Sequence, residues 1–294
     1  MRWCQDQSRH GDDLHTAPLP GGKSKLGRFV SELFKANGLV DGTYAEAYAG
    51  GAGAAIHLLI RGYAKRIALN DINHGVVAFW RAVLNHNEKF AQSIEKVPLT
   101  VKEWDRQKAI YSSEWRGFDF GFAFFYLNRT NRSGIMNAGV IGGRKQTGNY
   151  LIDARFNRQE LAERVRTLGR FRHAISITRS DALEFVDEMT EAKVRKLLFY
   201  FDPPYFGKGR ALYTDFYTAE DHASISARVR RLAQPWLMTY DDCPQIRTLY
   251  RGCRMMESEL SYSARDVRRG RELVMVSKGL RVPHVETTRG FEIV

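Results

Sequence analysis

The sequence contains one short stretch, Asp-Pro-Pro-Tyr at 202–205, whose residue types could act on an amine. It directly follows an apolar run at 197–201. Proline has a fixed φ and no N–H, and it keeps the preceding residue extended. Pro203 is therefore expected to hold Asp202 at the tip of a buried strand. The carboxylate and a main-chain carbonyl then form a rigid pair of acceptors, with Tyr205 as a flat face beside them.

Two acceptors and an aromatic face suit an exocyclic amine on a planar heterocycle. Hydrogen bonds from both amine hydrogens draw the nitrogen toward tetrahedral geometry and release its lone pair, while the ring stacks on Tyr205. An electrophilic methyl group aligned with that nitrogen could then be transferred by positioning and electrostatics. The alternative is an ordinary strand-ending turn, because Pro-Pro commonly marks turns. The order of the four residues after an apolar strand favours chemistry.

A glycine-rich turn at 49–53 offers a place for a cofactor. It joins a predicted strand to a helical run, so a ligand can approach the backbone and the N–H groups of the helix. Its glycines are Gly50, Gly51 and Gly53. Asp71 ends the next predicted strand, where an acid can hold a ribose diol. A nicotinamide dinucleotide and S-adenosylmethionine both fit this pattern, and a plain packing turn is the alternative.

Two more acids stand near predicted strand ends. Glu46 precedes the glycine turn, either as a polar residue at a strand edge or as a carboxylate near the ammonium group or backbone of a cofactor. Asp181 follows the predicted strand 173–178. Ligands bind at the carboxyl ends of strands in open α/β sheets, but Asp181 could equally cap the helix that starts at Ala182.

Predicted strands and helices alternate along two parts of the chain, which is typical of a parallel α/β sheet. The strands are expected at 43–48, 66–70, 173–178, 197–201 and 235–240, with 254–260 and 272–279 as an antiparallel edge. The alternation stops near Asn87. We therefore expect a loose leader at 1–17, a catalytic domain at 18–87 and 172–294, and a mostly helical insertion at 88–171.

Composition indicates the class of partner. The 294 residues carry a net charge of +12, with a pI near 9.7, and 44% of them are hydrophobic. A sizeable core is therefore available, and the basic excess favours an anionic partner such as nucleic acid. The odd number of cysteines, without ligand spacing, predicts reduced thiols in a cytoplasmic protein. No apolar run is long enough for a membrane span, and the histidines have no metal-ligand spacing.

These motifs, in this order, resemble the Dam-like class of DNA adenine-N6 methyltransferases that use S-adenosylmethionine. The tetrapeptide at 202–205 resembles the catalytic motif of that family, and 45–53 its first cofactor motif, with Tyr48 where phenylalanine is frequent. The sequence at 70–73 is similar to its ribose-binding motif. Gly21-Gly22-Lys23 is similar to an N-terminal element in which the lysine lies near the methionine part of the cofactor.

The resemblance implies a Rossmann-like methyltransferase sheet with a helical target-recognition insertion. It implies a catalytic site made of Asp202, Pro203, Pro204 and Tyr205. The cofactor site that it implies contains Gly22, Lys23, Glu46, Tyr48, Gly50, Gly51, Gly53, Asp71, Asp181 and Asp202. The double-stranded DNA contacts that we expect from the insertion are Asn128, Arg129, Asn131, Arg132, Asn137, Arg144 and Lys145. From Arg129 to Arg172 there are ten basic and three acidic residues, in keeping with phosphate contacts.

Several alternatives stay open at this point. Adenine-N6 methylation of RNA and cytosine-N4 methylation of DNA could use the same tetrapeptide. A dehydrogenase would use the glycine turn but leave 202–205 unexplained, and a DNA-binding module without activity would need none of it. Protein glutamine methylation typically has asparagine in place of Asp202. The target sequence does not follow from the resemblance, nor does pairing with a restriction enzyme. We expect a monomer or weak dimer of bacterial, archaeal or phage origin.

Overall fold

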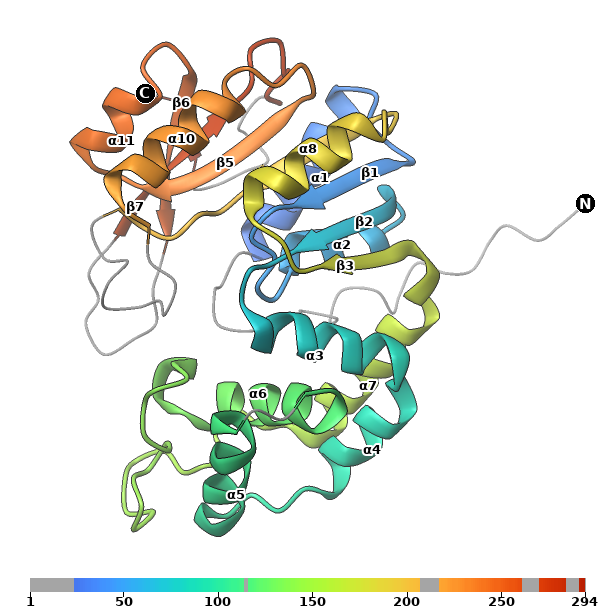
Figure 1. The fold of residues 1–294 in the computed structure, drawn as a ribbon, viewed down its shortest axis with the longest axis vertical. Helices are drawn as coiled ribbons and strands as arrows, with labels where there is room; N and C mark the ends of the chain where they lie inside the picture. Colours follow the sequence, from blue (N-terminus) through green and yellow to red (C-terminus); the bar gives the residue numbers. More distant parts are fainter. Residues whose placement is uncertain (1–23, 114–115, 207–216, 261–269, 284–290, 294) are drawn as a thin grey trace, which may run out of the picture.

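The protein folds around one open mixed sheet (Figure 1). The structure, a computed structural model, describes residues 24–113, 116–206, 217–260, 270–283 and 291–293. The predicted leader, together with Gly22 and Lys23, lies outside these residues. No helix in the described ranges is long and apolar enough to cross a membrane.

The sheet has eight strands in the order β3-β2-β1-β4-β5-β7-β6-β8. The strands are β1 (Gly42–Glu46), β2 (Ala64–Asn70), β3 (Ile175–Thr178), β4 (Leu197–Phe201), β5 (Trp236–Asp241), β6 (Arg254–Leu260), β7 (Gly270–Val276) and β8 (Phe291–Ile293). The first five in this order are parallel, and β7, β6 and β8 are antiparallel. The predicted α/β class and the antiparallel edge are confirmed, whereas β8 was not predicted.

Helices cover both faces of the sheet and enclose two hydrophobic cores. One face carries α1 (Ser24–Ala36), α2 (Gly53–Ile60) and α3 (His74–Asn85), and the other carries α8 (Ala182–Glu191), α10 (Ala219–Val229) and α11 (Pro244–Leu249). Along β4, Leu198 and Tyr200 enter the first core, and Phe199 and Phe201 enter the second. Successive strand residues point to opposite faces, so a central strand must be apolar throughout. This alternation explains the apolar run at 197–201.

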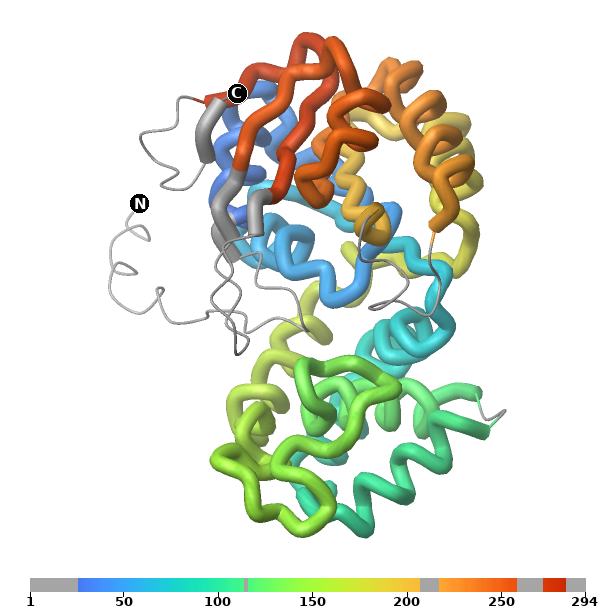
Figure 2. Tube along the Cα trace, turned by 90° about the vertical axis from the view of Figure 1, so that its left-hand side faces the viewer, coloured from blue at the N-terminus to red at the C-terminus, as the bar shows by residue number. Residues whose placement is uncertain are grey.

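A second group of helices lies beside the sheet domain (Figure 2). It contains α4 (Asn87–Lys96), α5 (Val101–Ser112), α6 (Phe118–Thr130) and α7 (Arg158–Arg170). Its core is rich in phenylalanine; Phe90, for example, makes edge contacts with Phe122 and Phe125 at 5.3 Å between ring centroids. This group, which we name the helical body, occupies the part of the chain where an insertion was predicted.

Helix α3 joins the two bodies through close contacts with α6. A Cβ added at Gly75 of α3 would lie 2.4 Å from the ring of Phe124 on α6. A Cβ at Gly121 of α6 would lie 2.4 Å from the carbonyl oxygen of Ala78 on α3. Real Cβ atoms do not approach other atoms this closely, so each helix offers a glycine where the other comes nearest.

Candidate active site

The predicted site residues converge because neighbouring parallel strands end at the same edge of the sheet. In the register, Glu46 of β1 lies opposite Leu69 of β2 and Tyr200 of β4. The residues that follow these strands therefore emerge at the same edge of the sheet, with Asp71 and Asp202 on either side of the end of β1. Open α/β sheets bind ligands at this edge.

The tetrapeptide 202–205 is held by two other strands. The hydroxyl of Thr239 on β5 donates a hydrogen bond of 2.7 Å to Oδ1 of Asp202. The Tyr205 hydroxyl donates to Glu272 of β7, a carboxylate that is only 4% exposed. The next residue, Phe206, donates its N–H to Oδ1 of Asp241 at 3.0 Å. Sequence reasoning missed Thr239 and Glu272 as parts of this site.

The glycine turn leaves backbone open to a ligand. Gly50 has a φ of +46° and Ala52 has a φ of +48°. Residues other than glycine rarely adopt this backbone conformation. A Cβ added at Gly50 or Gly53 would meet nothing within 4 Å. Helix α2 begins at Gly53 with no side-chain cap. Its first N–H groups therefore have no cap from within the described chain.

Asp71 shapes the turn as well as standing beside it. Its Oδ2 accepts from the Gly50 N–H at 2.9 Å, and its Oδ1 accepts from the Asn73 N–H at 2.9 Å. The indole N–H of Trp80 donates to the Gly50 carbonyl at 3.0 Å. A carboxylate has about four acceptor positions, so holding the turn does not by itself exclude hydrogen bonds from ribose hydroxyls. The ribose role stays a prediction, and the bond to Gly50 is a second role that the sequence did not reveal.

Asn70 is a further residue that sequence reasoning missed. It is fully buried, and its amide group donates to the carbonyls of Ala47 and Ser180 at 3.2 and 3.1 Å. Its Oδ1 accepts from Thr178 Oγ1 and from the N–H and hydroxyl of Ser180, each at 3.0 Å. Asn70 therefore ties together the ends of β1, β2 and β3. The sequence analysis included Asn70 in the motif at 70–73 but gave it no role of its own.

The two remaining acids differ in placement. Glu46 lies on β1 and is 2% exposed. Burial of Tyr44, followed by the charge of Glu46, raises the pKa of the Tyr44 hydroxyl well above its usual value. Asp181 is exposed and caps α8: it accepts from the Leu183 N–H at 2.7 Å, while Glu184 accepts from the Asp181 N–H at 3.3 Å. The capping interpretation of Asp181 is confirmed, and its cofactor role stays a prediction.

Tyr48 of the cofactor motif is linked to the segment that follows the tetrapeptide. Its hydroxyl lies 3.1 Å from that of Tyr217, and the rings meet edge to face at 6.0 Å. Burial raises the pKa of Tyr217 to about 12. Both hydroxyls therefore stay protonated at neutral pH and can keep this hydrogen bond.

The structure corrects part of the predicted DNA surface. Asn131 is fully buried; it accepts from the Trp104 indole at 2.7 Å and donates to the carbonyls of Ile135 and Met136 at 2.9 and 3.0 Å. Asn128, also buried, donates to the Gly134 carbonyl at 3.2 Å. These two amides position the loop after α6, because asparagine can satisfy interior carbonyls. We therefore assign them a structural role, and their predicted DNA contact stays a prediction that burial does not favour.

The predicted basic residues fall into three situations. Arg129 is 6% exposed, and its Nε has no hydrogen-bond partner within the described chain. Burial, followed by the charges of Arg155 and Arg164, lowers its pKa to about 10. Arg144 is exposed and forms a bidentate pair with Asp105 at 2.8 Å. Arg132 and Lys145 are exposed, and the structure describes no ion pair for either of them. Asn137, the remaining predicted contact, is also exposed.

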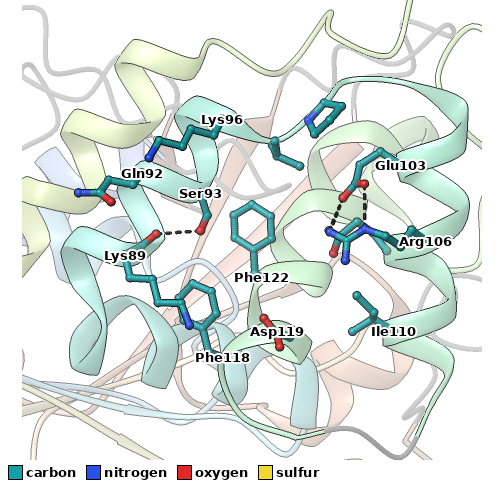
Figure 3. A pocket seen from close by; sticks show the side chains of 13 residues that line it. Lys89, Gln92, Ser93, Lys96, Glu103, Arg106, Ile110, Phe118, Asp119 and Phe122 are labelled. Carbon is teal, nitrogen blue, oxygen red and sulfur yellow. Dashed lines mark hydrogen bonds and ion pairs between the residues drawn. The ribbon is translucent and has the colours of Figure 1, made fainter.

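A cavity of about 330 Å³ lies in the helical body between α4, α5 and α6 (Figure 3). Phe118 and Phe122 form part of its wall, with the Lys89 ammonium 4.0 Å from the ring centre of Phe118. The Glu103–Arg106 ion pair, at 2.7 Å, lies on the α5 side. None of the predicted catalytic, cofactor or DNA residues lines this cavity.

Two of the solved structures similar to this chain are distant likenesses, and no curated protein matches the sequence. A "conserved hypothetical protein" of Streptococcus pyogenes is 13% identical, covering 83% of this chain and 90% of its own, with a TM-score of 0.34. The rRNA methyltransferase aviRa of Streptomyces viridochromogenes is 12% identical, covering 90% of this chain and 91% of its own, with a TM-score of 0.36. These scores are too low to support an argument, so the fold rests on the sheet order.

The family is shown by sequence. A family model described as "D12 class N6 adenine-specific DNA methyltransferase" matches residues 20–264. That span includes the glycine turn, Asp71, the helical body and the tetrapeptide 202–205. The chain belongs to the D12 class of N6 adenine-specific DNA methyltransferases, as its resemblance to Dam-like enzymes predicted.

Proposed function

We propose that this enzyme takes its methyl group from S-adenosylmethionine, acts on adenine in double-stranded DNA, and uses residues 202–205 as its catalytic site. One observation carries the proposal. Asp202, fixed by Thr239 at the tip of β4, stands next to the end of β1, where the glycine turn begins. An acceptor for an amine and an open backbone turn for a cofactor are therefore neighbours.

The turn fits S-adenosylmethionine. The open space at Gly50 and Gly53 admits a ligand, and the uncapped N-terminus of α2 suits the carboxylate of an amino acid. Asp71 would accept from ribose hydroxyls and Glu46 from the ammonium group. By resemblance, the remaining cofactor contacts come from Gly22, Lys23, Tyr48, Gly51 and Asp181. When bound, this cofactor supplies the electrophile, a methyl group carried on a positively charged sulfur.

The catalytic residues then act on the adenine amine. The Asp202 carboxylate and the Pro203 carbonyl accept from its two hydrogens, so the nitrogen lone pair is released from the ring. Pro204, which has no N–H, keeps the backbone that carries these two acceptors extended. With the cofactor bound, the amine nitrogen would bond to the methyl carbon, the electrons of the broken carbon–sulfur bond would stay with sulfur, and one amine proton would pass to water. Tyr205 stacks on the base, its hydroxyl anchored by Glu272.

The amine of a paired adenine cannot be reached inside a duplex, so the target base must be flipped out of the stack. Arg132, Asn137 and Lys145 are exposed on the helical body and would contact phosphates during this step. We expect the enzyme to act in the cytoplasm, as a monomer or weak dimer, in a bacterium, an archaeon or a phage-infected cell. Sequencing host DNA for N6-methyladenine after expression tests the proposal, and labelled RNA in parallel tests the nearest rival.

Removing the ring of Tyr205 is expected to weaken use of the target base. Tyr205→Ala should lower kcat/KM for DNA by roughly 5- to 150-fold, because base stacking on an aromatic side chain is worth about 1–3 kcal/mol. Tyr205→Phe keeps the ring and removes the hydroxyl that donates to Glu272, so its loss should be smaller, about 5-fold or less. Steady-state methyl incorporation measures both. Wild-type kcat/KM in the alanine variant would remove the stacking role.

Exposed basic residues of the helical body are expected to set the salt dependence of DNA binding. The double variant Arg132→Ala with Lys145→Ala should reduce the slope of log K against log salt by about 1.8, because each phosphate contact contributes about 0.9. Arg144→Ala is the matched control: Arg144 already pairs with Asp105, so its removal should change the slope less. Binding titrations at several salt concentrations give the slopes. A double variant with an unchanged slope places the DNA on another surface.

A further inference from the structure

We propose that Thr239, supported by Tyr200, is a positioning residue that fixes the orientation of the Asp202 carboxylate for methyl transfer. The inference rests on the proposed function of Asp202 and deepens it, because it says what aims that carboxylate. Nothing in the family description or in the sequence motifs assigns Thr239 a role.

The first support is its position in the sheet. Strand β5 is apolar around Thr239, which is itself only 2% exposed. The β4–β5 register pairs Phe201 with Met238, so Thr239 lies beside Asp202 at the next step along the two strands. A buried hydroxyl among apolar neighbours requires hydrogen-bond partners.

The second support is a chain of three side chains. Tyr200 lies on β4, and Asp202 follows the last residue of this strand, two positions further on; alternation along an extended chain therefore brings both side chains to the same face. The hydroxyl of Thr239 lies 2.8 Å from that of Tyr200 and 2.7 Å from Oδ1 of Asp202. An ionised carboxylate only accepts hydrogen bonds. The Thr239 proton therefore points to Asp202, and the Tyr200 hydroxyl donates to Thr239.

Tyr200 is itself held in place. It is 4% exposed, and its ring stacks on that of Tyr44 at 6.1 Å between centroids, with 17° between the planes. A rigid, buried tyrosine thus fixes the threonine rotamer, and the threonine fixes one carboxylate oxygen. The other oxygen of Asp202 is then directed by the planar geometry of the carboxylate. Transfer depends on aligning the amine nitrogen within fractions of an ångström, so this support affects rate more than binding.

Thr239→Val tests the inference, since valine keeps the shape and removes the hydroxyl. We expect kcat for methyl transfer to fall about 10- to 100-fold, the range for a small misplacement of a reacting group. The KM values for DNA and S-adenosylmethionine should stay within about 2-fold, because neither ligand touches Thr239 in this proposal. Thr239→Ser restores the hydroxyl and should recover kcat to within about 3-fold of wild type.

Two further variants separate positioning from general structure. Tyr200→Phe removes the donor to Thr239 and should give a smaller fall in kcat, about 3- to 10-fold, again without a change in KM. Thr190→Val on α8 removes a hydroxyl that bonds only its own helix at Val186, 2.7 Å away, and should leave kcat unchanged. Melting temperatures are measured for all four. If Thr239→Val does not fold, the serine and phenylalanine variants still decide the question.

Three results would overturn the inference: a wild-type kcat in Thr239→Val, no rescue by serine, or a fall in kcat in Thr190→Val equal to that in Thr239→Val. Failure of the proposed function would look different. In that case the wild-type enzyme itself would transfer no methyl group to DNA, or Asp202→Ala would remain active. A wild-type enzyme that is active and depends on Asp202, but not on the Thr239 hydroxyl, would remove only the positioning role.

Discussion

Replacing Asp202 with alanine is expected to reduce methyl transfer to adenine by about 10²–10³-fold or more, the cost of losing one electrostatic partner of a transition state. The carboxylate is the charged acceptor of the site, held at 2.7 Å by Thr239. Without it, the amine keeps its lone pair in the ring, and positive charge developing on nitrogen has no counter-charge beside it. Transfer of a tritiated methyl group to unmodified DNA measures the loss.

The controls for this experiment follow from the structure. Asp202→Asn keeps the shape and one acceptor oxygen, so it should lie between alanine and wild type. Binding of S-adenosylmethionine to Asp202→Ala should be preserved within about 10-fold, since the glycine turn is built by Asp71 rather than by Asp202. Methyl incorporation by Asp202→Ala at the wild-type rate would move the catalytic centre away from 202–205.

The second large effect is expected at Asp71. Asp71→Ala leaves the N–H groups of Gly50 and Asn73 without their acceptor, at a cost of about 1–3 kcal/mol for each unsatisfied group. It also removes the proposed partner of the ribose. We expect affinity for S-adenosylmethionine to fall at least about 100-fold, equivalent to about 2.7 kcal/mol. Calorimetric titration with the inhibitor sinefungin provides the measurement.

Replacing an acid elsewhere in the protein controls for the general effect of removing one negative charge. Asp187 on α8 pairs with Arg228 at 2.5 Å on the surface. Asp187→Ala should therefore leave cofactor affinity unchanged, because exposed ion pairs contribute about 1 kcal/mol or less. If Asp71→Ala binds sinefungin as tightly as the Asp187 variant does, the cofactor lies away from the glycine turn.

The sequence revealed what depends on neighbours along the chain. The apolar run of β4 could be read directly because a central parallel strand is buried on both faces, and Pro203 fixed the geometry of the residue before it. The glycine turn and Asp71 were likewise legible from strand–turn–helix order. Thr239 and Glu272 were not, because they meet the tetrapeptide only after β5 and β7 have paired across the sheet. Nothing local distinguishes them from other strand residues.

In the helical body, the structure gives two asparagines a structural role that the sequence did not reveal. In a sequence rich in glycine and arginine, Asn128 and Asn131 look like residues that contact phosphates and bases. In the structure both residues are buried, and Asn131 accepts a hydrogen bond from the indole of Trp104 on α5. An amide suits both environments, and only the fold of α5 against α6 decides between them. Arg132, on the exposed side of the same loop, keeps its predicted role as a phosphate contact.

The reciprocal glycines of α3 and α6 have a bearing on how such an enzyme can change its target. At Gly121 the backbone of α6 meets the backbone of α3, and at Gly75 the backbone of α3 meets the ring of Phe124, so a larger residue at either glycine would push the helical body away from the sheet domain. Loops of the helical body that lie far from this contact could therefore vary in sequence while the contact itself stays unchanged. Under the proposed function, substitutions in those loops could change the target sequence without moving the helical body relative to the sheet domain.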